Sequence, residues 1–400
     1  MHASGAMPGS QTSLREANRG RVLEAVKTHG ALTQVEVAGL TGLSPATVSN
    51  IVKELVAAGV LNARPSTRSG RRAQQVSLAR GVGICVGVDF GYRHLRVALA
   101  DLSQEILAEQ RLPLPADHRA DAGMDRAALL VGDLLERIDS SPQEVLGIGL
   151  GVPAPVDVST GRIGSATLMP GWQGVQLADE LSARLGAPVV VDNNANLGAL
   201  AEVQRGAARG CSNVAYIRAS NGVGSGLVLG GQLFRGHVGT AGEIGHVTID
   251  ENGPVCRCGN RGCLETFVRA PVLLEMLRAS HGPMSLREVI SRAQQGDAGC
   301  RRVLADAGRH IGVAVAGVCN LLNPELVVLG GALAAAEDLL LDPMRDVVQR
   351  FALPAAAERV RVVPGQLKER AEVLGAVGLA VRHAEVTAGR GVALSRVATG

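Results

Sequence analysis

Three cysteines and one histidine lie close together in the segment from Gly242 to Glu265, which reads GEIGHVTIDENGPVCRCGNRGCLE. Thiolates and imidazole are the ligands that Zn²⁺ prefers, and four protein ligands form a closed tetrahedral site with a structural role. The alternative is that the cysteines form disulfides or stay reduced in a core. Three cysteines cannot all pair with one another, however, and C-x-C spacing strains a bridge. The segment therefore predicts a structural Zn²⁺ site whose candidate ligands are His246, Cys256, Cys258 and Cys263.

Two carboxylates stand at the ends of this segment. The spacing C-x-C-x4-C differs from the common C-x2-C finger and indicates a pinned loop inside a larger fold. Pinning the loop would fix Glu243 and Glu265 as polar groups that a ligand could contact. The alternative is that both are surface carboxylates beside a metal loop.

A second polar cluster follows a predicted strand. The stretch 189–202, VVVDNNANLGALAE, reads as a strand that runs into a helix, with Asp192, Asn193 and Asn194 at the carboxyl end of the strand. Folds of the α/β class bind ligands at that end of their strands. Glycine turns near positions 89, 222 and 330 could each approach a phosphate through bare backbone, although each turn alone is weak evidence.

Length and charge divide the chain into a small basic head and a larger body. A chain of 400 residues with 46% hydrophobic residues predicts two or three domains with sizeable cores. Residues 1–80 hold ten Lys or Arg and four Asp or Glu, a net charge of +6, and the remainder holds 30 and 33, a net charge of −3. A basic head on an acidic body suggests that the head binds a polyanion.

Targeting signals and transmembrane runs are not evident. No apolar run reaches the length of a transmembrane helix, and the start of the chain lacks the charged and apolar regions of a signal peptide. The other four cysteines show no framework spacing, which is typical of a reducing compartment. We therefore expect a soluble cytoplasmic protein with no membrane contact.

The head shows three helix signals. Residues 1–12 are polar and predicted to be disordered, and Ser13 with Glu16 has capping-box spacing. Thr33 with Glu36 repeats that spacing, and Ser44 can cap a third helix with Pro45 at its first position. In the third helix apolar residues follow a helical period and are expected in the core: Val48, Ile51, Val52, Leu55 and Val56.

This pattern predicts a winged helix-turn-helix over residues 13–80. Two short helices joined by a glycine turn, the second with small polar residues at its start, suit insertion into the major groove. A hairpin with its tip at 64–72 would be the wing; the alternative is a protein-binding helical module with a solvated basic loop. The residues expected to contact DNA are Ser44, Ala46, Thr47, Ser49, Asn50 and Lys53 in the helix and Arg68, Arg71 and Arg72 in the wing.

Beyond position 81 the sequence changes to short apolar strands that end in glycine turns. Hairpins are predicted at 83–101 and 214–231, further strands at 146–157 and 324–333, and helices over 286–322 and 371–384. The strand-turn-strand unit recurs on both sides of the polar cluster. We therefore expect one α/β domain of two similar lobes with a cleft over residues 81–385, and a loose tail over 386–400.

The chain resembles the transcription-factor branch of the ROK family (repressors, open reading frames, kinases). The motifs that carry the resemblance are AGEIGH at 241–246, CRCGNRGCLE at 256–265, NNAN at 193–196 and NPELVVLGGAL at 323–333. The resemblance implies an actin-like, two-lobed sugar-kinase fold that is usually dimeric or tetrameric. It also implies the zinc site above and a sugar in the cleft, contacted by Asn193, Asn194, Glu243, His246 and Glu265. His246 could give one ring nitrogen to zinc and the other to a sugar hydroxyl.

Several departures from the family's kinases argue against catalysis. Those kinases have an aspartate, the base for the sugar hydroxyl, where this chain has Asn194, and loss of such a base typically slows a reaction about 10²- to 10⁴-fold. Tyr92 and Arg93 replace the small residues of the first phosphate loop, and Asn221 replaces the usual threonine of the second. Leu168 stands where an asparagine is expected near the sugar, so the sugar is not identified.

The sequence thus predicts a sugar-responsive transcriptional regulator, most simply a repressor, without catalytic activity. Its expected partners are a double-stranded DNA operator, a small sugar or sugar-phosphate effector, and further copies of the chain in a homodimer or homotetramer. Two alternatives remain open. One is an active sugar kinase with an added DNA-binding domain, and the other is a constitutive DNA-binding protein whose lobes serve only for assembly.

Overall fold

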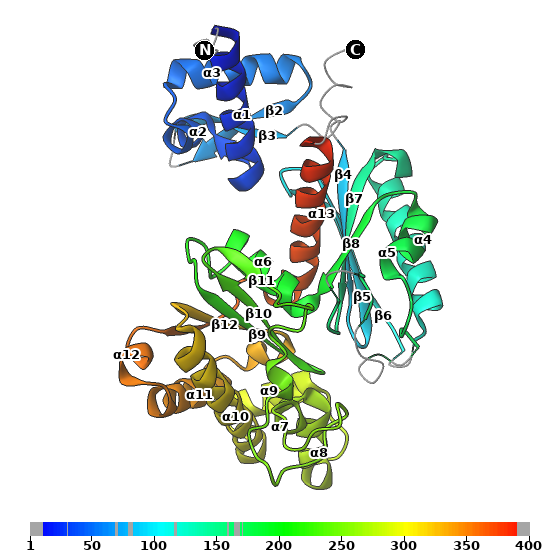
Figure 1. Cartoon of the computed structure of the whole chain (residues 1–400), viewed down its shortest axis with the longest axis vertical. Helices are drawn as coiled ribbons and strands as arrows, with labels where there is room; N and C mark the ends of the chain where they lie inside the picture. Colours follow the sequence, from blue (N-terminus) through cyan, green and yellow to red (C-terminus); the bar gives the residue numbers. More distant parts are fainter. Residues whose placement is uncertain are drawn as a thin grey trace, which may run out of the picture.

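The N-terminal head of the computed structural model is a winged helix-turn-helix (Figure 1). The structure describes residues 11–29, 31–68, 71–78, 83–115, 118–157, 160–163, 169 and 171–389. The strands of the head form a small sheet in the order β1-β3-β2. Its elements are α1 (Gln11–His29), β1 (Leu32–Thr33), α2 (Gln34–Thr41), α3 (Pro45–Ala57), β2 (Leu61–Arg68) and β3 (Arg71–Leu78).

Local capping fixes the two helices of the helix-turn-helix. Thr33 and Glu36 form the reciprocal capping box at the start of α2, and Gly42 ends that helix with a left-handed backbone (φ 66°) that glycine adopts without steric cost. The Ser44 hydroxyl accepts from the Thr47 amide at the start of α3, and Pro45 takes the first helical position. These predictions from the sequence are confirmed.

Three details of the head differ from expectation. Ser13 lies inside α1, which begins at Gln11, so it does not cap that helix. Val56 is 37% exposed because it lies in the last turn of α3, beyond the buried stripe of Val48, Ile51, Val52 and Leu55. The strands of the wing are also longer than predicted, since β2 and β3 stay paired from Leu61↔Leu78 to Arg68↔Arg71. Disorder was predicted for residues 1–12, but Gln11 and Thr12 belong to α1, and residues 1–10 lie outside the described residues.

Two five-stranded sheets form the centres of two lobes. Each sheet joins an antiparallel meander to two parallel strands, in the orders β6-β5-β4-β7-β8 and β11-β10-β9-β12-β13. This repetition confirms the expectation of two similar lobes. The first sheet contains β4 (Ile84–Phe90), β5 (His94–Ala100), β6 (Ile106–Pro113), β7 (Val145–Val152) and β8 (Val189–Asn193). The second contains β9 (Val214–Ala219), β10 (Val223–Leu229), β11 (Gln232–Phe234), β12 (Leu326–Gly330) and β13 (Arg361–Pro364).

Helices cover both faces of each sheet (Figure 1). In the first lobe α4 (Ala120–Arg137) and α5 (Leu177–Leu185) pack over one face. The second lobe buries one face of its sheet under a helical layer. This layer contains α7 (Glu265–Val268), α8 (Ala270–His281), α9 (Leu286–Gln294), α10 (Ala298–Leu322), α11 (Asp338–Phe351) and α12 (Pro354–Ala357). Short 3₁₀ helices occur at Pro142–Glu144, Ile244–His246, Ala332–Ala336 and Lys368–Arg370.

Two helices lie between the lobes. α6 (Asn194–Arg205) packs on β9 and β10 of the second sheet, and α13 (Ala371–Gly389) packs on β4 and β7 of the first. They cross closely at Gly375, where a Cβ would lie 1.9 Å from the carbonyl oxygen of Leu197. Only glycine permits this approach. α13 extends to Gly389, so residues 386–389, predicted as a loose tail, are helical, while 390–400 lie outside the described residues.

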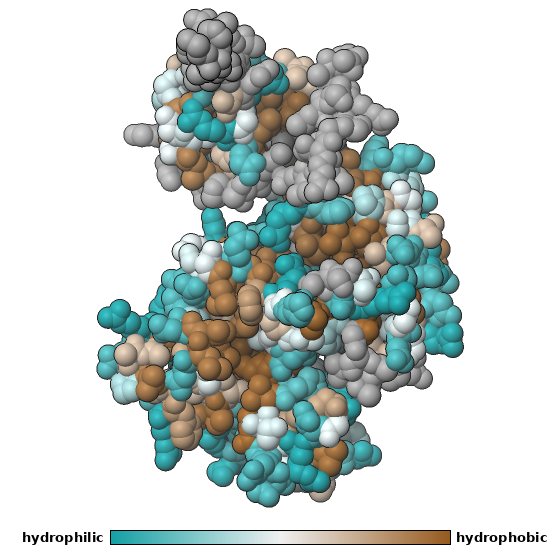
Figure 2. All heavy atoms as spheres, in the orientation of Figure 1, coloured by the Kyte–Doolittle hydropathy of each residue, from teal (hydrophilic) through white to brown (hydrophobic). Residues whose placement is uncertain are grey.

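The head joins the body next to α13. Buried apolar residues of the head, such as Val76, belong to one cluster with Val377 and Val381 of α13. In the space-filling view a notch separates the head from the second lobe (Figure 2). Within the described part of the chain, none of the helices combines the length and apolar character that crossing a bilayer requires.

Candidate functional site

The predicted metal ligands converge in the second lobe. One ligand atom from each of His246, Cys256, Cys258 and Cys263 lies within 4.8 Å of the others. Nδ1 of His246 is 3.6 Å from Sγ of Cys256, and Sγ of Cys258 is 3.7 Å from Sγ of Cys263. Tetrahedral coordination with Zn–S of about 2.3 Å and Zn–N of about 2.0 Å would separate two sulfurs by about 3.8 Å and a nitrogen from a sulfur by about 3.5 Å.

These distances fit a tetrahedral ion and exclude a disulfide. A disulfide would hold two sulfurs about 2.05 Å apart, and all seven cysteines are free. Hydrogen bonds within the loop keep the ligands together, since the Cys256 amide donates to the Asn260 carbonyl at 2.7 Å and Thr248 pairs with Cys263 across an isolated bridge. The cluster can therefore bind a metal ion.

All five residues predicted to contact a sugar line one cavity between the lobes: Asn193, Asn194, Glu243, His246 and Glu265. The volume of this cavity is about 30 Å³. That volume suits one or two water molecules and is too small for a monosaccharide. A sugar can therefore enter only if the lobes separate or the side chains that line the cavity move.

The two asparagines already have intramolecular partners. Asn193 caps α6 by accepting from the Ala195 amide at 2.7 Å, and its Nδ2 donates to the Ala154 carbonyl at 3.0 Å. Asn194 is 1% exposed, and its Nδ2 donates to the Phe90 carbonyl at 2.9 Å. The Oδ1 of Asn194 is buried without a hydrogen-bond partner. Of the two side-chain amide oxygens, the Oδ1 of Asn194 is therefore the one without a partner that could accept a hydrogen bond from a ligand.

The two glutamates differ in their environments. Glu265 accepts from the Val223 amide at 3.0 Å and forms an ion pair with Arg257 at 2.8 Å. Burial, together with the nearby Glu265 carboxylate, raises the pKa of Glu243 to about 7. The Nε2 of His246 lies 3.9 Å from Glu243, while its Nδ1 faces the cysteines. The histidine is thus oriented with one nitrogen toward each site.

Three further residues line this cavity, and reasoning from the sequence did not predict that they would: Tyr92, Arg218 and Arg257. Nη2 of Arg257, from the metal loop, donates to the Tyr92 hydroxyl at 2.8 Å, and its guanidinium carbon lies 5.2 Å from the centre of the Tyr92 ring. Tyr92 also donates to the Pro153 carbonyl at 3.3 Å. The only sequence signal was the presence of an arginine between two metal-binding cysteines.

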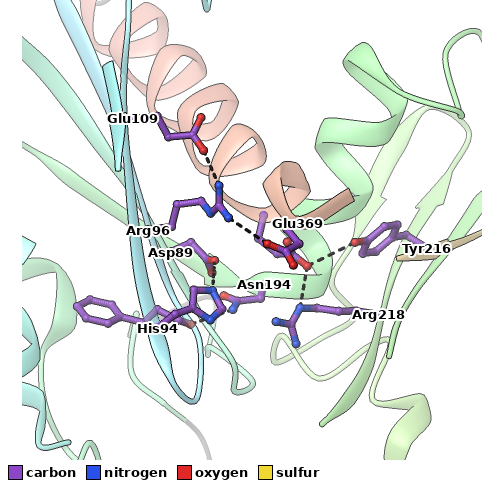
Figure 3. Close-up of polar contacts among 10 residues, drawn as sticks. Asp89, His94, Arg96, Glu109, Asn194, Tyr216, Arg218 and Glu369 are labelled. Carbon is purple, nitrogen blue, oxygen red and sulfur yellow. Dashed lines mark hydrogen bonds and ion pairs between the residues drawn. The ribbon is translucent and has the colours of Figure 1, made fainter. Parts of the chain in front are cut away.

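Charged groups line the rest of the interlobe cleft (Figure 3). Nε of Arg218, from the second lobe, pairs with Glu372 of α13 at 2.7 Å, and the two residues are only 8% and 4% exposed. In the first lobe, Arg96 pairs with Glu109 at 2.6 Å. Nε2 of His94 lies 3.1 Å from Asp89, and the His94 ring blocks Gly91, where a Cβ would lie 2.1 Å from it. The backbone of the first glycine turn is therefore covered by a side chain.

The candidate DNA-binding residues lie on the outer side of α3. Ala46, Asn50 and Lys53 are exposed, and Thr47 and Ser49 are half-buried. Ser44 is exposed, although its hydroxyl caps the helix. Arg68 and Arg71 are opposite each other at the end of the wing, and Arg72 is opposite Thr67. The side chains of these three arginines lie outside the described residues, as does Leu168.

Comparisons with known families cover nearly the whole chain. The ROK family pattern matches residues 85–383, and that of the MarR family matches residues 16–72. The chain is 29% identical to the xylose repressor of Caldicellulosiruptor bescii, over 93% of this chain and 97% of the repressor. It is 33% identical to a glucokinase of Halalkalibacterium halodurans, over 72% of this chain and 92% of the glucokinase.

A solved structure also matches over the full length. The crystal structure of a ROK family transcriptional regulator, a homologue of the E. coli MLC protein, superimposes with a TM-score of 0.72 at 25% identity. The match covers 97% of this chain and 100% of that regulator. A winged head followed by a sugar-kinase-like body is thus an arrangement shared with a known regulator.

Proposed function

Because this chain belongs to the ROK family, we propose that it is a sugar-responsive repressor of transcription that has lost kinase activity. The observation that carries the proposal is the extent of the two matches. The chain aligns with a repressor over 93% of its length, head included, whereas its match to a glucokinase covers only 72%. A protein that acts only as a sugar kinase does not need a DNA-binding head.

The head would bind an operator through α3 and the wing. Small and polar residues at the start of α3 allow close approach to base edges, where Asn50 can form paired hydrogen bonds with adenine. Lys53 would contact phosphate, as would the wing arginines Arg68, Arg71 and Arg72. Ser44, Ala46, Thr47 and Ser49 would lie along the same groove.

The cavity of about 30 Å³ would be the collapsed form of the sugar pocket. Glu243, His246 and Glu265 from the second lobe and Asn193 and Asn194 at the junction supply donors and acceptors suited to vicinal hydroxyl groups. A sugar can shift the lobes only through different affinities for their two arrangements. Binding would therefore favour an arrangement with more space between Tyr92 and the metal loop.

Two features support the loss of catalysis. The buried amide of Asn194 donates its Nδ2 proton to the Phe90 carbonyl and cannot take a proton from a sugar hydroxyl. Tyr92, whose hydroxyl is hydrogen-bonded to Arg257, lines both the sugar pocket and the rest of the cleft, through which a phosphoryl group would have to pass. Phosphoryl transfer would therefore require both a group that can accept the sugar's proton and an open path past Tyr92.

A bound Zn²⁺ ion would hold the metal loop in shape. The thiolates of Cys256, Cys258 and Cys263 and the Nδ1 of His246 would be its ligands. The ion supplies a fixed crosslink, and the chain's own residues do the recognition: His246 presents Nε2 to the pocket, and Arg257 is held within reach of Tyr92 and Glu265.

The sugar signal would reach DNA through α13 in a homodimer or homotetramer. The first turn of this helix pairs with the second lobe through Glu372, and its later turns share an apolar cluster with the head. A change in lobe arrangement would therefore alter how two heads of an oligomer are spaced on DNA.

The test is a gel shift with the DNA upstream of the protein's own gene, titrated with neutral pentoses and hexoses. We expect a specific complex at nanomolar protein that one sugar dissociates. A complex that no sugar changes would remove the sensor part of the proposal. A parallel assay of ADP release should stay well below about 1 s⁻¹, the low end of kinase turnover.

A further inference from the structure

A second group of metal-binding side chains lies in the helical layer of the second lobe, where α8, α9 and α10 follow one another (Figure 1). His281 is the last residue of α8, Asp297 is the N-cap of α10, and Cys300 lies in the first turn of α10. One ligand atom from each of the three lies within 4.8 Å of the others. These residues belong neither to the first cluster nor to the lining of the sugar pocket.

The Asp297 carboxylate has one oxygen more than its helix cap requires. Its Oδ1 accepts from the Cys300 amide at 2.8 Å and so caps α10. Its Oδ2 faces Nε2 of His281 at 3.1 Å. A ring nitrogen and a carboxylate oxygen approach this closely only with a proton or a metal ion between them, because both otherwise present lone pairs. A positive centre therefore belongs between these two atoms.

The other ring nitrogen of His281 has a partner of its own. Nδ1 lies 2.7 Å from the Ser280 hydroxyl, and that hydroxyl donates to the Leu277 carbonyl at 3.2 Å. With its proton directed to Leu277, the Ser280 oxygen accepts from Nδ1–H, which leaves the lone pair of the neutral ring on Nε2. Metal-binding histidines are held in this way, with the second nitrogen donating to a fixed acceptor.

Cys300 adds a sulfur on the buried side of this pair. It is 0% exposed, whereas the side chains of His281 and Asp297 are 16% and 30% exposed. Gly299 lets the imidazole ring lie against the start of α10, because a Cβ there would be 3.0 Å from Cε1 of His281. The site thus has a soft ligand inside and a solvent-facing edge from which an ion and a water molecule can enter.

The spacing suits a tetrahedral ion. With Zn–N and Zn–O of about 2.1 Å and Zn–S of about 2.3 Å, the nitrogen would lie about 3.4 Å from the oxygen and the sulfur about 3.6 Å from either. The nitrogen and oxygen are 3.1 Å apart, and the sulfur, at most 4.8 Å away, has to approach by no more than about 1.2 Å. Mixed nitrogen, oxygen and sulfur ligands favour Zn²⁺ or a similar ion over Mg²⁺ and Ca²⁺, which bind oxygens.

We propose that His281, Asp297 and Cys300 form a second metal site, which binds Zn²⁺ or a similar divalent transition ion with water as the fourth ligand. Binding releases the thiol proton of Cys300 to solvent as the metal–sulfur bond forms. The ion would tie the end of α8 to the start of α10 and close the chain segment that contains α9. Three protein ligands hold an ion less firmly than four, so this site fills only when free Zn²⁺ is supplied, whereas the first cluster keeps its ion through purification. The inference does not depend on the proposed repressor function.

The experiment counts the zinc ions that the full-length protein binds in equilibrium dialysis against micromolar free Zn²⁺, measured by mass spectrometry. Cys300→Ser and His281→Gln each remove one ligand, and we expect each to bind about one ion per chain fewer than the wild-type protein. The matched control is Cys319→Ser, which changes another buried cysteine of α10 that belongs to neither cluster and should keep the wild-type number. The difference between variants decides the test, whatever the first cluster holds.

Cobalt identifies the ligands. Co²⁺ titrated into the zinc-loaded protein should produce the charge-transfer absorption of a cobalt–thiolate bond in the near ultraviolet, and Cys300→Ser should abolish it. Ser280→Ala, which removes only the partner of Nδ1, should weaken binding about 10- to 100-fold. This graded loss distinguishes a metal-binding histidine from one that only pairs with Asp297.

The proposal is overturned if Cys300→Ser and His281→Gln bind as many ions as the wild-type protein, because a proton alone then lies between His281 and Asp297. Loss of an ion in Cys319→Ser as well would also overturn it, since the loss would then follow from damage to α10. If circular dichroism shows that Cys300→Ser does not fold, His281→Gln, at the half-buried edge of the site, decides the outcome alone.

Discussion

Nη2 of Arg257 and the hydroxyl of Tyr92 are 2.8 Å apart, although the residues are 165 positions apart in the chain and belong to different lobes. This hydrogen bond joins the candidate metal loop to the first glycine turn, and both residues line the proposed sugar pocket. The proposed function depends on all three of these parts: the metal loop, the first glycine turn and the pocket.

Removing that hydrogen bond should make the sugar bind more tightly. In Tyr92→Phe the ring remains but the acceptor for Arg257 is lost, so opening the pocket requires about 1 kcal/mol less. We expect the Kd for the inducing sugar to fall about fivefold, measured by calorimetry. A higher Kd would mean instead that the hydroxyl contacts the sugar.

Replacing one metal ligand should release the ion. Cys258→Ser removes one of four ligands, and we expect zinc content, measured by mass spectrometry, to fall from about one ion per chain to near zero. The melting temperature should fall by roughly 2–4 °C for each kcal/mol lost. Cys211→Ser, which changes a cysteine outside the cluster, should keep its zinc. Full zinc content in Cys258→Ser would contradict the four-ligand site.

Restoring a carboxylate at the position of the kinase base should not restore activity. In Asn194→Asp an oxygen would face the Phe90 carbonyl at a residue that is 1% exposed, which destabilises the fold by about 1–3 kcal/mol. We expect a lower melting temperature and no ADP release above background. Asn252→Asp on the exposed loop is the stability control. Efficient turnover by Asn194→Asp would show that Tyr92 and Arg257 are no barrier.

The salt dependence of DNA binding should separate the roles of two α3 residues. Lys53→Ala should weaken binding to all sequences and reduce the slope of log K against log salt by about one, whereas Asn50→Ala should lose discrimination at one base pair. Arg126→Ala, an exposed charge on α4, should leave gel shifts unchanged. An unchanged slope in Lys53→Ala would place that residue away from phosphate.

Breaking the buried ion pair between the second lobe and α13 should cost stability. Glu372→Gln leaves the Arg218 charge, which is 8% exposed, without its partner, a loss of about 3 kcal/mol. Thermal melting should shift down by roughly 5–10 °C. The double variant Arg218→Met with Glu372→Met should recover much of the loss, because it leaves no unpaired charge. Equal loss in both variants would mean that packing, not charge, holds α13 here.

Local signals in the sequence predicted much of this molecule. The caps at Thr33 and Ser44 depend on residues within three positions, and the candidate metal ligands lie within eighteen, so their spacing alone carried the information. The recurring hairpins likewise predicted two similar lobes, and the two sheets indeed have the same strand order.

Contacts between distant segments could not be predicted in this way. Arg257 gave no sign of reaching Tyr92, nor Arg218 of pairing with Glu372, because both contacts depend on how the lobes face each other. Val56 fits the helical period, but α3 ends before that face meets the core. The size of the sugar pocket also depends on side-chain packing that no motif encodes.

Because α6 and α13 cross at Gly375, a small rotation of α13 at this point would move the far end of the helix by several ångströms. The helix continues for 14 residues beyond that point, about 21 Å at 1.5 Å per residue. A turn of about 10° around this fulcrum would displace the far end by about 4 Å relative to the second lobe. In a symmetric pair of subunits the two displacements add to about 8 Å, more than two base-pair steps of about 3.4 Å, enough to put two heads out of phase with their half-sites.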